Sequence, residues 1–231
     1  MLSPAEWDAI QLSMRIALSA VGWILPPGIA IAWLLARREF RGKALLDGIV
    51  HLPLVLPPVV IGYLLLVSLG RRGFIGQWLH EVAGISLPFT WQGAAVASGV
   101  MAFPLFVRAV RLSLEAVDPK LEAAAHTLGA GRWRIFFTIT LPLSLPGLLT
   151  GTMLAFARAL SEFGATITFA SNIPGETRTL PLALYTLIQS PGQEAAAARL
   201  CVISVVIAMA SLVASEWLAR SARLRTRERD G

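Results

Sequence analysis

The sequence predicts an all-α integral membrane protein that crosses the bilayer about five times. Of its 231 residues, 55% are hydrophobic and only 15% are charged, whereas a soluble domain carries about 25% charged residues. The mean hydropathy is +0.66, and the apolar residues gather in runs of the length that a membrane helix needs, about 20 residues. These observations exclude a disordered chain and an ordinary soluble domain. The single cysteine, Cys201, also excludes a disulfide scaffold.

Five apolar runs are predicted to span the membrane. The first contains one charge, Arg15, near its start, the second contains none, and the third contains Arg108 near its end. The fourth contains Arg158 and Glu162, and the fifth has charges only towards its ends. The runs cover residues 11–36, 49–69, 94–110, 143–169 and 195–219. Because the chain is short for two domains, residues 1–231 are interpreted as one transmembrane domain.

The basic residues give the orientation, because they follow alternate spans. Lys and Arg are enriched in cytoplasmic loops, so we expect the N-terminus outside and the C-terminus in the cytoplasm. The net charge of +6 is therefore read as a topology signal, and membrane lipid is an expected partner of the spans. Nucleic acid is not an expected partner, since its binding requires basic residues on one shared face. For the arginine-rich tail, a lipid or nucleic-acid role is the alternative. The three basic groups are Arg37, Arg38, Arg41 and Lys43; Arg108, Arg111, Lys120, Arg132 and Arg134; and Arg220, Arg223, Arg225, Arg227 and Arg229.

Two connections between the spans are long. Residues 70–92 are expected to form an external loop with a short helix. Residues 172–194 contain Pro-Gly twice and an apolar stretch, residues 180–188, that is too short to cross the bilayer. We expect this stretch to pack as an interfacial or re-entrant helix, because irregular backbone cannot face lipid. A sixth crossing in this segment is the alternative.

Prolines interrupt the first three spans. Each removes a backbone donor and is expected to kink or unwind its helix. Membrane helices tolerate a single proline, but three interrupted spans favour a protein that rearranges or leaves carbonyl groups facing a cavity. The residues are Pro26 and Pro27 in the first span, Pro53, Pro57 and Pro58 in the second, and Pro104 in the third.

The fourth span combines a stripe of small residues with two charges. Small residues recur every four positions, a pattern that lets two helices approach closely, either within one subunit or at a two-fold interface. Arg158 and Glu162 are four apart, so on a continuous helix they share a face. They are interpreted as an ion pair that fixes packing, with a role near a pore as the alternative. The stripe is Gly147, Gly151, Ala155 and Ala159.

Hydroxyl and amide groups follow the charged pair. Together with Glu162, they are the candidates for lining a translocation path, because such groups solvate an oxyanion without holding it tightly. Hydrogen bonding between neighbouring helices is the alternative use. The residues are Thr166, Thr168, Ser171 and Asn172.

The cytoplasmic loop of residues 118–142 is predicted to be a compact docking element. Asp118 before Pro119 is a typical helix start, and a short helix can run from Lys120 until Gly129 ends it. A second short helix can then continue to Pro142. An ordinary interfacial loop with its aromatic residues at the headgroups is the alternative.

This loop resembles the EAA loop by which permeases of ABC importers contact their ATPase. The family pattern is E-A-A, three residues, G, nine residues, then I-x-L-P. The spacing from Gly129 to Ile139 matches it, while Glu122 lies one position before the acidic residue of the pattern, which falls on Ala123. The resemblance implies that the residues contacting the ATPase are Glu122, Ala123, Ala124, Ala125, Gly129, Ile139, Leu141 and Pro142.

Other stretches extend the resemblance over nearly the whole chain and narrow the family. Residues 51–58, 70–76, 162–169 and 172–179 are similar to bacterial molybdate permeases, and sulfate and thiosulfate permeases share parts of the pattern. The resemblance implies the type I ABC importer permease fold, in the bacterial inner membrane. It implies a second permease copy, in a homodimer, together with a periplasmic oxyanion-binding protein and cytoplasmic ABC ATPase subunits. The cargo is expected to be molybdate, with sulfate, thiosulfate or tungstate as alternatives.

The chain is expected to have no enzyme activity of its own. It lacks the G-x-x-x-x-G-K-[ST] motif that cradles phosphates, because Gly42-Lys43 has Arg37 where the first glycine belongs. ATP hydrolysis is therefore assigned to a partner subunit. An integral membrane enzyme would need clustered polar catalytic groups, which the sequence does not offer.

No cofactor or metal site is expected either, because His51, His80 and His126 fall on different elements. A self-sufficient secondary transporter is the alternative from another class. It needs an inverted repeat or a relay of carboxylates, and Glu162 is the one deep carboxylate in the spans.

Overall fold

The computed structural model describes the backbone of residues 3–227, with side chains up to residue 211 and at residue 213. The basic tail of residues 220–229, which contributes to the expected orientation, lies outside the described side chains.

The described residues form helices and no strand. They follow one another as α1 (Pro4–Arg37), α2 (Lys43–Val55), α3 (Pro58–Leu69), α4 (Phe74–Ala83), α5 (Trp91–Glu115), α6 (Pro119–Thr127), α7 (Arg132–Ile135), the π-helical turn η1 (Phe136–Thr140), α8 (Leu141–Leu143), α9 (Leu145–Leu160), α10 (Gly164–Ala170), α11 (Leu180–Ile188) and α12 (Glu194–Arg227). The all-α class predicted from composition is confirmed.

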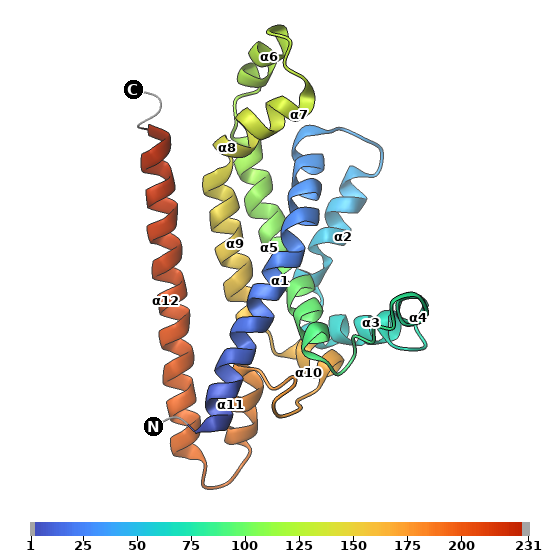
Figure 1. Cartoon of the computed structure of the whole chain (residues 1–231), viewed down its shortest axis with the longest axis vertical. Coiled ribbons are helices and arrows are strands. Elements are labelled where there is room, and N and C mark those ends of the chain that lie inside the picture. Colours follow the sequence, from blue (N-terminus) through green and yellow to red (C-terminus); the bar gives the residue numbers. More distant parts are fainter. Residues whose placement is uncertain (1–2, 228–231) are drawn as a thin grey trace.

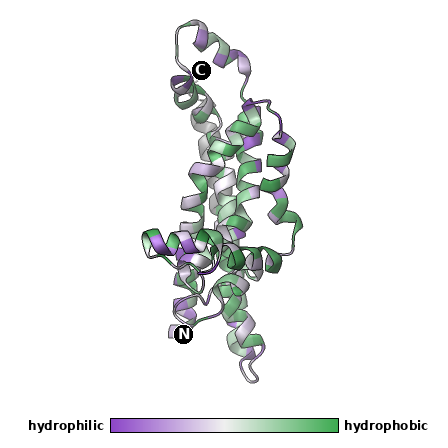
Figure 2. Cartoon of the chain, turned by 90° about the vertical axis from the view of Figure 1, so that its right-hand side faces the viewer, coloured by the Kyte–Doolittle hydropathy of each residue, from purple (hydrophilic) through white to green (hydrophobic). Residues whose placement is uncertain are grey.

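Helices α1, α5 and α9 form the packed centre, with α2 and α12 on its two sides (Figure 1). Small and large residues interlock there: Ala20, Ala102 and Ala155 are fully buried beside Phe106. Hydrophobic residues occupy much of the length of the helices, and hydrophilic residues gather around α6 and α7 at one end (Figure 2). This distribution suits a bundle whose middle lies in hydrocarbon and whose end stands in water.

The spans partly differ from the expected five. Helices α1 and α5 and residues 194–211 of α12 are long and apolar enough to cross a membrane, and two bent pairs bring the number to five if each counts as one span. The second expected span, residues 49–69, divides into α2 and α3, which are bent by 116°. The fourth, residues 143–169, ends as a helix at Leu160 and resumes at Gly164. The first break lies at prolines that the sequence predicts to interrupt the second span, whereas hydropathy gives no signal for the break in the fourth, because apolar residues continue on both sides of it.

Prolines explain the break between α2 and α3, whereas the prolines inside other helices do not end them. Pro57 and Pro58 stand where α2 has ended and α3 begins, since two consecutive residues without an N–H cannot continue a helical ladder. Pro26 and Pro27 lie inside α1, Pro53 lies inside α2 and Pro104 lies inside α5, and none of them ends its helix. The expected unwinding therefore occurs at one proline pair only.

The stripe of small residues on α9 packs against α5 of the same chain. A Cβ atom at Gly147 would collide with Ser113, and one at Gly151 would approach Ala109 Cβ to 3.1 Å. Ala155 and Ala159 are buried on the same side. Of the two alternatives left open by the sequence, the contact within the subunit is the one that the structure supports.

The broken ends of the second and fourth spans meet at the side of the bundle. Helix α10 packs against α3, and the two helices lie beside each other below α2 (Figure 1). A Cβ atom at Gly62 of α3 would lie 2.7 Å from the Ala165 carbonyl oxygen, and one at Gly164 would lie 2.8 Å from Pro58 Cβ. Glycine at these two positions therefore permits the close approach of α3 and α10. Helix α4 follows α3 in the expected external loop.

Helix α11 is the expected short helix between residues 172 and 194. Its nine residues are about 13 Å long at 1.5 Å per residue, too short for the hydrocarbon core of about 30 Å. It packs on α12 and α1, and the Ser13 hydroxyl of α1 accepts a hydrogen bond of 2.6 Å from the Leu180 N–H. A sixth crossing at this segment is therefore not seen.

Candidate functional site

The loop between α5 and α9 forms at one end of the bundle, and its local sequence explains its shape. The Asp118 carboxylate accepts a hydrogen bond of 2.9 Å from the Lys120 N–H, and Pro119 occupies the first turn of α6. The helix buries none of its residues. Gly129 then takes a φ of +81°, a conformation that side chains disfavour. The predicted cap, helix and glycine break are all confirmed.

Glu122 faces the bundle and not the solvent side of α6. Its Oε1 accepts hydrogen bonds from Arg37 Nη2 at 2.9 Å and from Thr140 Oγ1 at 2.7 Å. Arg37, the last residue of α1, also donates to the Val117 carbonyl at 3.3 Å. One carboxylate thus joins α6 to the end of α1 and to the last residue of η1.

The second half of the loop continues into α9 through a π-helical turn. Helix α7 leads into η1 and α8, and the segment bends by 67° where α9 begins. Trp133 and Phe137 are 77% and 59% exposed and stack on each other at 6.4 Å between ring centroids. Of the remaining motif residues, Ile139 and Leu141 are half-buried, while Ala123, Ala124 and Pro142 are exposed and Ala125 is half-buried. The loop therefore offers exposed small residues on α6 and exposed aromatic residues on α7 and η1.

Glu162 sits in the break between α9 and α10, and it is 2% exposed. Its Oε2 lies 2.6 Å from Arg158 Nη1, and its Oε1 accepts a hydrogen bond of 2.8 Å from the Ala165 N–H. The predicted ion pair is present, but the expectation that both residues share one continuous helix is wrong, because α9 has ended before Glu162. The carboxylate instead links the last turn of α9 to the first turn of α10.

Most of the polar groups after Glu162 are engaged within the chain. Thr168 Oγ1 donates to the Gly164 carbonyl at 2.8 Å. Asn172 accepts from Arg178 Nε and donates to Thr186 Oγ1, both at 2.9 Å. These contacts correspond to the alternative of bonding between neighbouring segments.

Ser171 and Thr166 differ from the other polar residues of this set, the first in its backbone and the second in its hydroxyl. Ser171 has a φ of +67°, a conformation that is uncommon for any residue other than glycine, and its carbonyl accepts from Thr177 Oγ1 at 3.2 Å. Thr166 is fully buried, and its hydroxyl has no hydrogen-bond partner in the part of the chain that the structure describes. Among the described residues this hydroxyl is thus both unpaired and enclosed by the chain.

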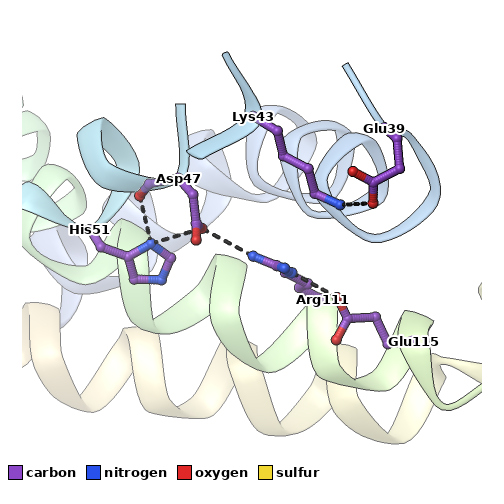
Figure 3. A network of polar contacts seen from close by, with 6 residues as sticks. All are labelled: Glu39, Lys43, Asp47, His51, Arg111 and Glu115. Carbon is purple, nitrogen blue, oxygen red and sulfur yellow. Dashed lines mark hydrogen bonds and ion pairs between the residues drawn. The ribbon is translucent and has the colours of Figure 1, made fainter. Parts of the chain in front are cut away.

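A network of polar side chains that is not evident from the sequence joins α2 to α5 (Figure 3). Asp47 Oδ1 lies 3.3 Å from His51 Nδ1 and 3.1 Å from Arg111 Nη1. Arg111 Nε donates to Glu115 Oε1 at 2.8 Å. The spacing of four within each pair was a signal available in the sequence, but the bridge between the two helices was not. No group of three His, Cys, Asp or Glu side chains able to hold a metal occurs among the described residues.

Comparison with known proteins places this architecture in a family. Residues 28–224 match the family described as "Binding-protein-dependent transport system inner membrane component". The molybdenum transport system permease protein ModB of Escherichia coli (strain K12) is 66% identical over 97% of this chain and 98% of its own length. The protein of the same name from Haemophilus influenzae is 61% identical over 93% of this chain and 94% of its own length.

The fold has solved counterparts as well. A bacterial ABC transporter involved in the import of alginate has a chain that superposes with a TM-score of 0.76 at 18% identity, covering 95% of this chain and 80% of that one. The expected type I importer permease fold is thus confirmed. The chain belongs to the family of inner membrane components of binding-protein-dependent transport systems.

Proposed function

We propose that this chain is the membrane-spanning subunit of an ABC importer for molybdate. The observation that carries the proposal is the 66% identity, over nearly the whole of both chains, to a permease named for molybdenum transport. Transport is driven by a separate ATPase subunit, and a periplasmic oxyanion-binding protein delivers the cargo. The chain itself moves between conformations whose populations ATP binding and hydrolysis shift.

Uptake of radiolabelled molybdate tests this function. The chain is reconstituted in vesicles with its ATPase and binding protein, and accumulation is followed with ATP and with a non-hydrolysable analogue. We expect ATP-dependent uptake that a large excess of sulfate leaves in place. Preferential accumulation of sulfate or thiosulfate would favour the related permeases, and uptake without ATPase would favour a secondary transporter.

The loop of residues 118–142 is proposed to couple the ATPase to the bundle. Support comes from the exposure of α6, from the positive φ of Gly129 and from the end of the molecule at which the loop stands. We assign the contact with the ATPase to the exposed side of α6 and to the I-x-L-P turn, whereas Glu122 holds the loop to α1 from the opposite side. The residues of the coupling loop are Glu122, Ala123, Ala124, Ala125, Gly129, Ile139, Leu141 and Pro142.

The translocation path is proposed to lie between two copies of this chain, in a homodimer, beside the break between α9 and α10. The break in the helix at Glu162 and the packing of α10 on the second broken span, at α3, support this position. Discontinuous helices commonly form transport sites because their ends leave polar backbone groups available. The proposed path residues are Glu162, Thr166, Thr168, Ser171 and Asn172, with Glu162 in a positioning role.

The proposed orientation has the N-terminus in the periplasm and the C-terminus in the cytoplasm. The N-terminus and the α6–α7 end lie at opposite ends of the bundle, and α12 finishes at the same end as α6 and α7 (Figure 1). This arrangement supports the orientation, because the coupling loop must stand on the ATPase side.

A further inference from the structure

A cavity of about 340 Å³ lies at the base of the coupling loop. The end of α1 forms one wall, and α6, α7 and η1 form the others. Its polar lining comes mainly from Arg37, Arg38, Glu122, His126 and Arg132. Residues from the end of α1 and from the loop between α5 and α9 therefore line one cavity.

The charges around this cavity do not balance. Three arginines face one carboxylate, and Oε1 of Glu122 already accepts hydrogen bonds from Arg37 and Thr140. Among the described residues, no carboxylate forms an ion pair with Arg38 or Arg132, and both side chains are exposed beside the hollow. Two positive charges are thus left without an opposite charge beside the same hollow.

One donor of a guanidinium that lines the cavity is also without a partner among the described residues. Arg37 Nε is buried and makes no hydrogen bond, although Nη2 of the same guanidinium makes two. Buried donors in native proteins nearly always have a partner, which is protein, water or a bound ion. The unbalanced charge indicates an anion as the missing partner, and the unused donor belongs to one of the arginines that line the cavity.

The position of the cavity indicates which anion. Arg37 ends α1 at the basic end of the bundle, where a membrane helix emerges among the headgroups of the inner leaflet. Trp33, one turn earlier, lines the same cavity, and the Arg38 guanidinium lies 5.5 Å from the centre of its ring. Tryptophan is enriched at this depth, and arginine forks match phosphate oxygens in bidentate geometry.

We propose that this cavity binds a phosphate group, held by Arg37, Arg38 and Arg132. The group is either the headgroup phosphate of an anionic inner-leaflet lipid or free inorganic phosphate. Once bound, it bridges the end of α1 to α7, adding to the link that Glu122 makes between α1 and α6. The coupling loop is thereby fastened to the bundle more firmly than its own side chains allow.

Native mass spectrometry of the complete transporter tests the binding without any transport assay. The purified complex of this chain with its ATPase is stripped of lipid and titrated with short-chain phosphatidylglycerol, with phosphatidylcholine or with inorganic phosphate. We expect Arg132→Gln to weaken phosphatidylglycerol binding at least tenfold. The matched control is Arg134→Gln, two residues on in the same helix and not part of the cavity lining, which should change the affinity less than twofold.

The three ligands of the titration distinguish a lipid headgroup from free phosphate. Binding of phosphatidylglycerol that inorganic phosphate does not displace identifies the lipid, and binding of inorganic phosphate that depends on Arg132 identifies the free ion. Arg38→Gln is a second variant that must weaken binding if Arg132→Gln prevents assembly. Equal effects of Arg132→Gln and Arg134→Gln, equal binding of phosphatidylcholine, or binding to the separate chain but not to the assembled complex would each overturn the proposal. Molybdate uptake enters none of these measurements, so they stand whether or not the proposed cargo is right.

Discussion

The carboxylate of Glu122 shows how the position of one residue changes its partner. The family pattern places an acidic residue at the position of Ala123, which is exposed on α6, while Glu122 is one position earlier. A shift of one residue on a helix turns a side chain by about 100°. Glu122 accordingly points back to Arg37 and Thr140. We infer that its contribution to coupling is to hold the loop on α1.

Replacing Glu122 by alanine should therefore uncouple hydrolysis from uptake. The variant loses two hydrogen bonds of a partly exposed group, an effect of about 1 kcal/mol or somewhat more, so we expect assembly to survive. The ATPase rate should stay within twofold while uptake per ATP falls several-fold in vesicles. Lys120→Ala, an exposed change on the same helix, is the control, and an equal loss in that variant would contradict this role.

Gly129 and Gly131 form a matched pair for testing the turn of the loop. Both have open space where a Cβ atom would lie, but φ is +81° at Gly129 and −70° at Gly131. Gly129→Val should therefore strain the backbone by roughly 1–2 kcal/mol and reduce association with the ATPase. Gly131→Val should leave association unchanged. Co-purification of the ATPase measures both, and normal binding by Gly129→Val would show that the turn geometry is not required.

At the scale of elements, the close contact between α9 and α5 rests on glycine. Gly147→Ala should be destabilising, because its Cβ atom would collide with Ser113 and overpacking costs about 1–3 kcal/mol. Gly48→Ala in α2, where nothing lies within 4 Å of the added atom, should be neutral or slightly stabilising. Thermal unfolding in detergent compares the two. A higher melting temperature for Gly147→Ala would mean that α9 does not approach α5 so closely.

The pair Arg158 and Glu162 should act as a fastener of two helices. Glu162 is nearly fully buried, so removing either partner leaves an unpaired charge in a site that is shielded from water. For a buried pair, this lowers the free energy of unfolding by roughly 3–5 kcal/mol. We expect Arg158→Ala and Glu162→Ala to lower the yield of assembled complex. A swap of the two charges should rescue it only in part, because arginine at position 162 cannot accept from the Ala165 N–H. Normal assembly of Arg158→Ala with loss of uptake alone would instead place the arginine on the path.

At the scale of the whole molecule, the sequence predicts those features that depend on hydropathy and on local helix caps. The all-helical class, the span character of α1 and α5, the cap at Asp118 and the short helix α11 follow from local patterns. The break at Glu162 does not, because apolar residues continue on both sides and the carboxylate stabilises the new helix start only in three dimensions. The bridge from Asp47 to Arg111 is hidden for the same reason, since its partners are 64 positions apart.

The orientation of the whole chain can be tested with reporters. A fusion after residue 225 should report the cytoplasm, and an insertion at Gly73, at the start of α4, should report the periplasm. An insertion at Ser190, just beyond α11, should also report the periplasm, because α11 is too short to cross. The opposite result at residue 225 or Gly73 would reverse the proposed orientation, and a cytoplasmic Ser190 alone would restore a sixth crossing.

The packing of α3 on α10 has a consequence for the order in which the protein is made. Helix α3 leaves the ribosome early, but the helix on which it rests emerges only after α5, the coupling loop and α9 have been synthesised. Neither α2 nor α3 is long enough to cross the bilayer alone. The segment from Lys43 to Leu69 therefore cannot reach its final packing until α10 has been synthesised, and before that it remains at the translocon or in the bilayer. Nascent chains that stop before Gly164 should accordingly leave α3 open to proteases that the full-length chain resists.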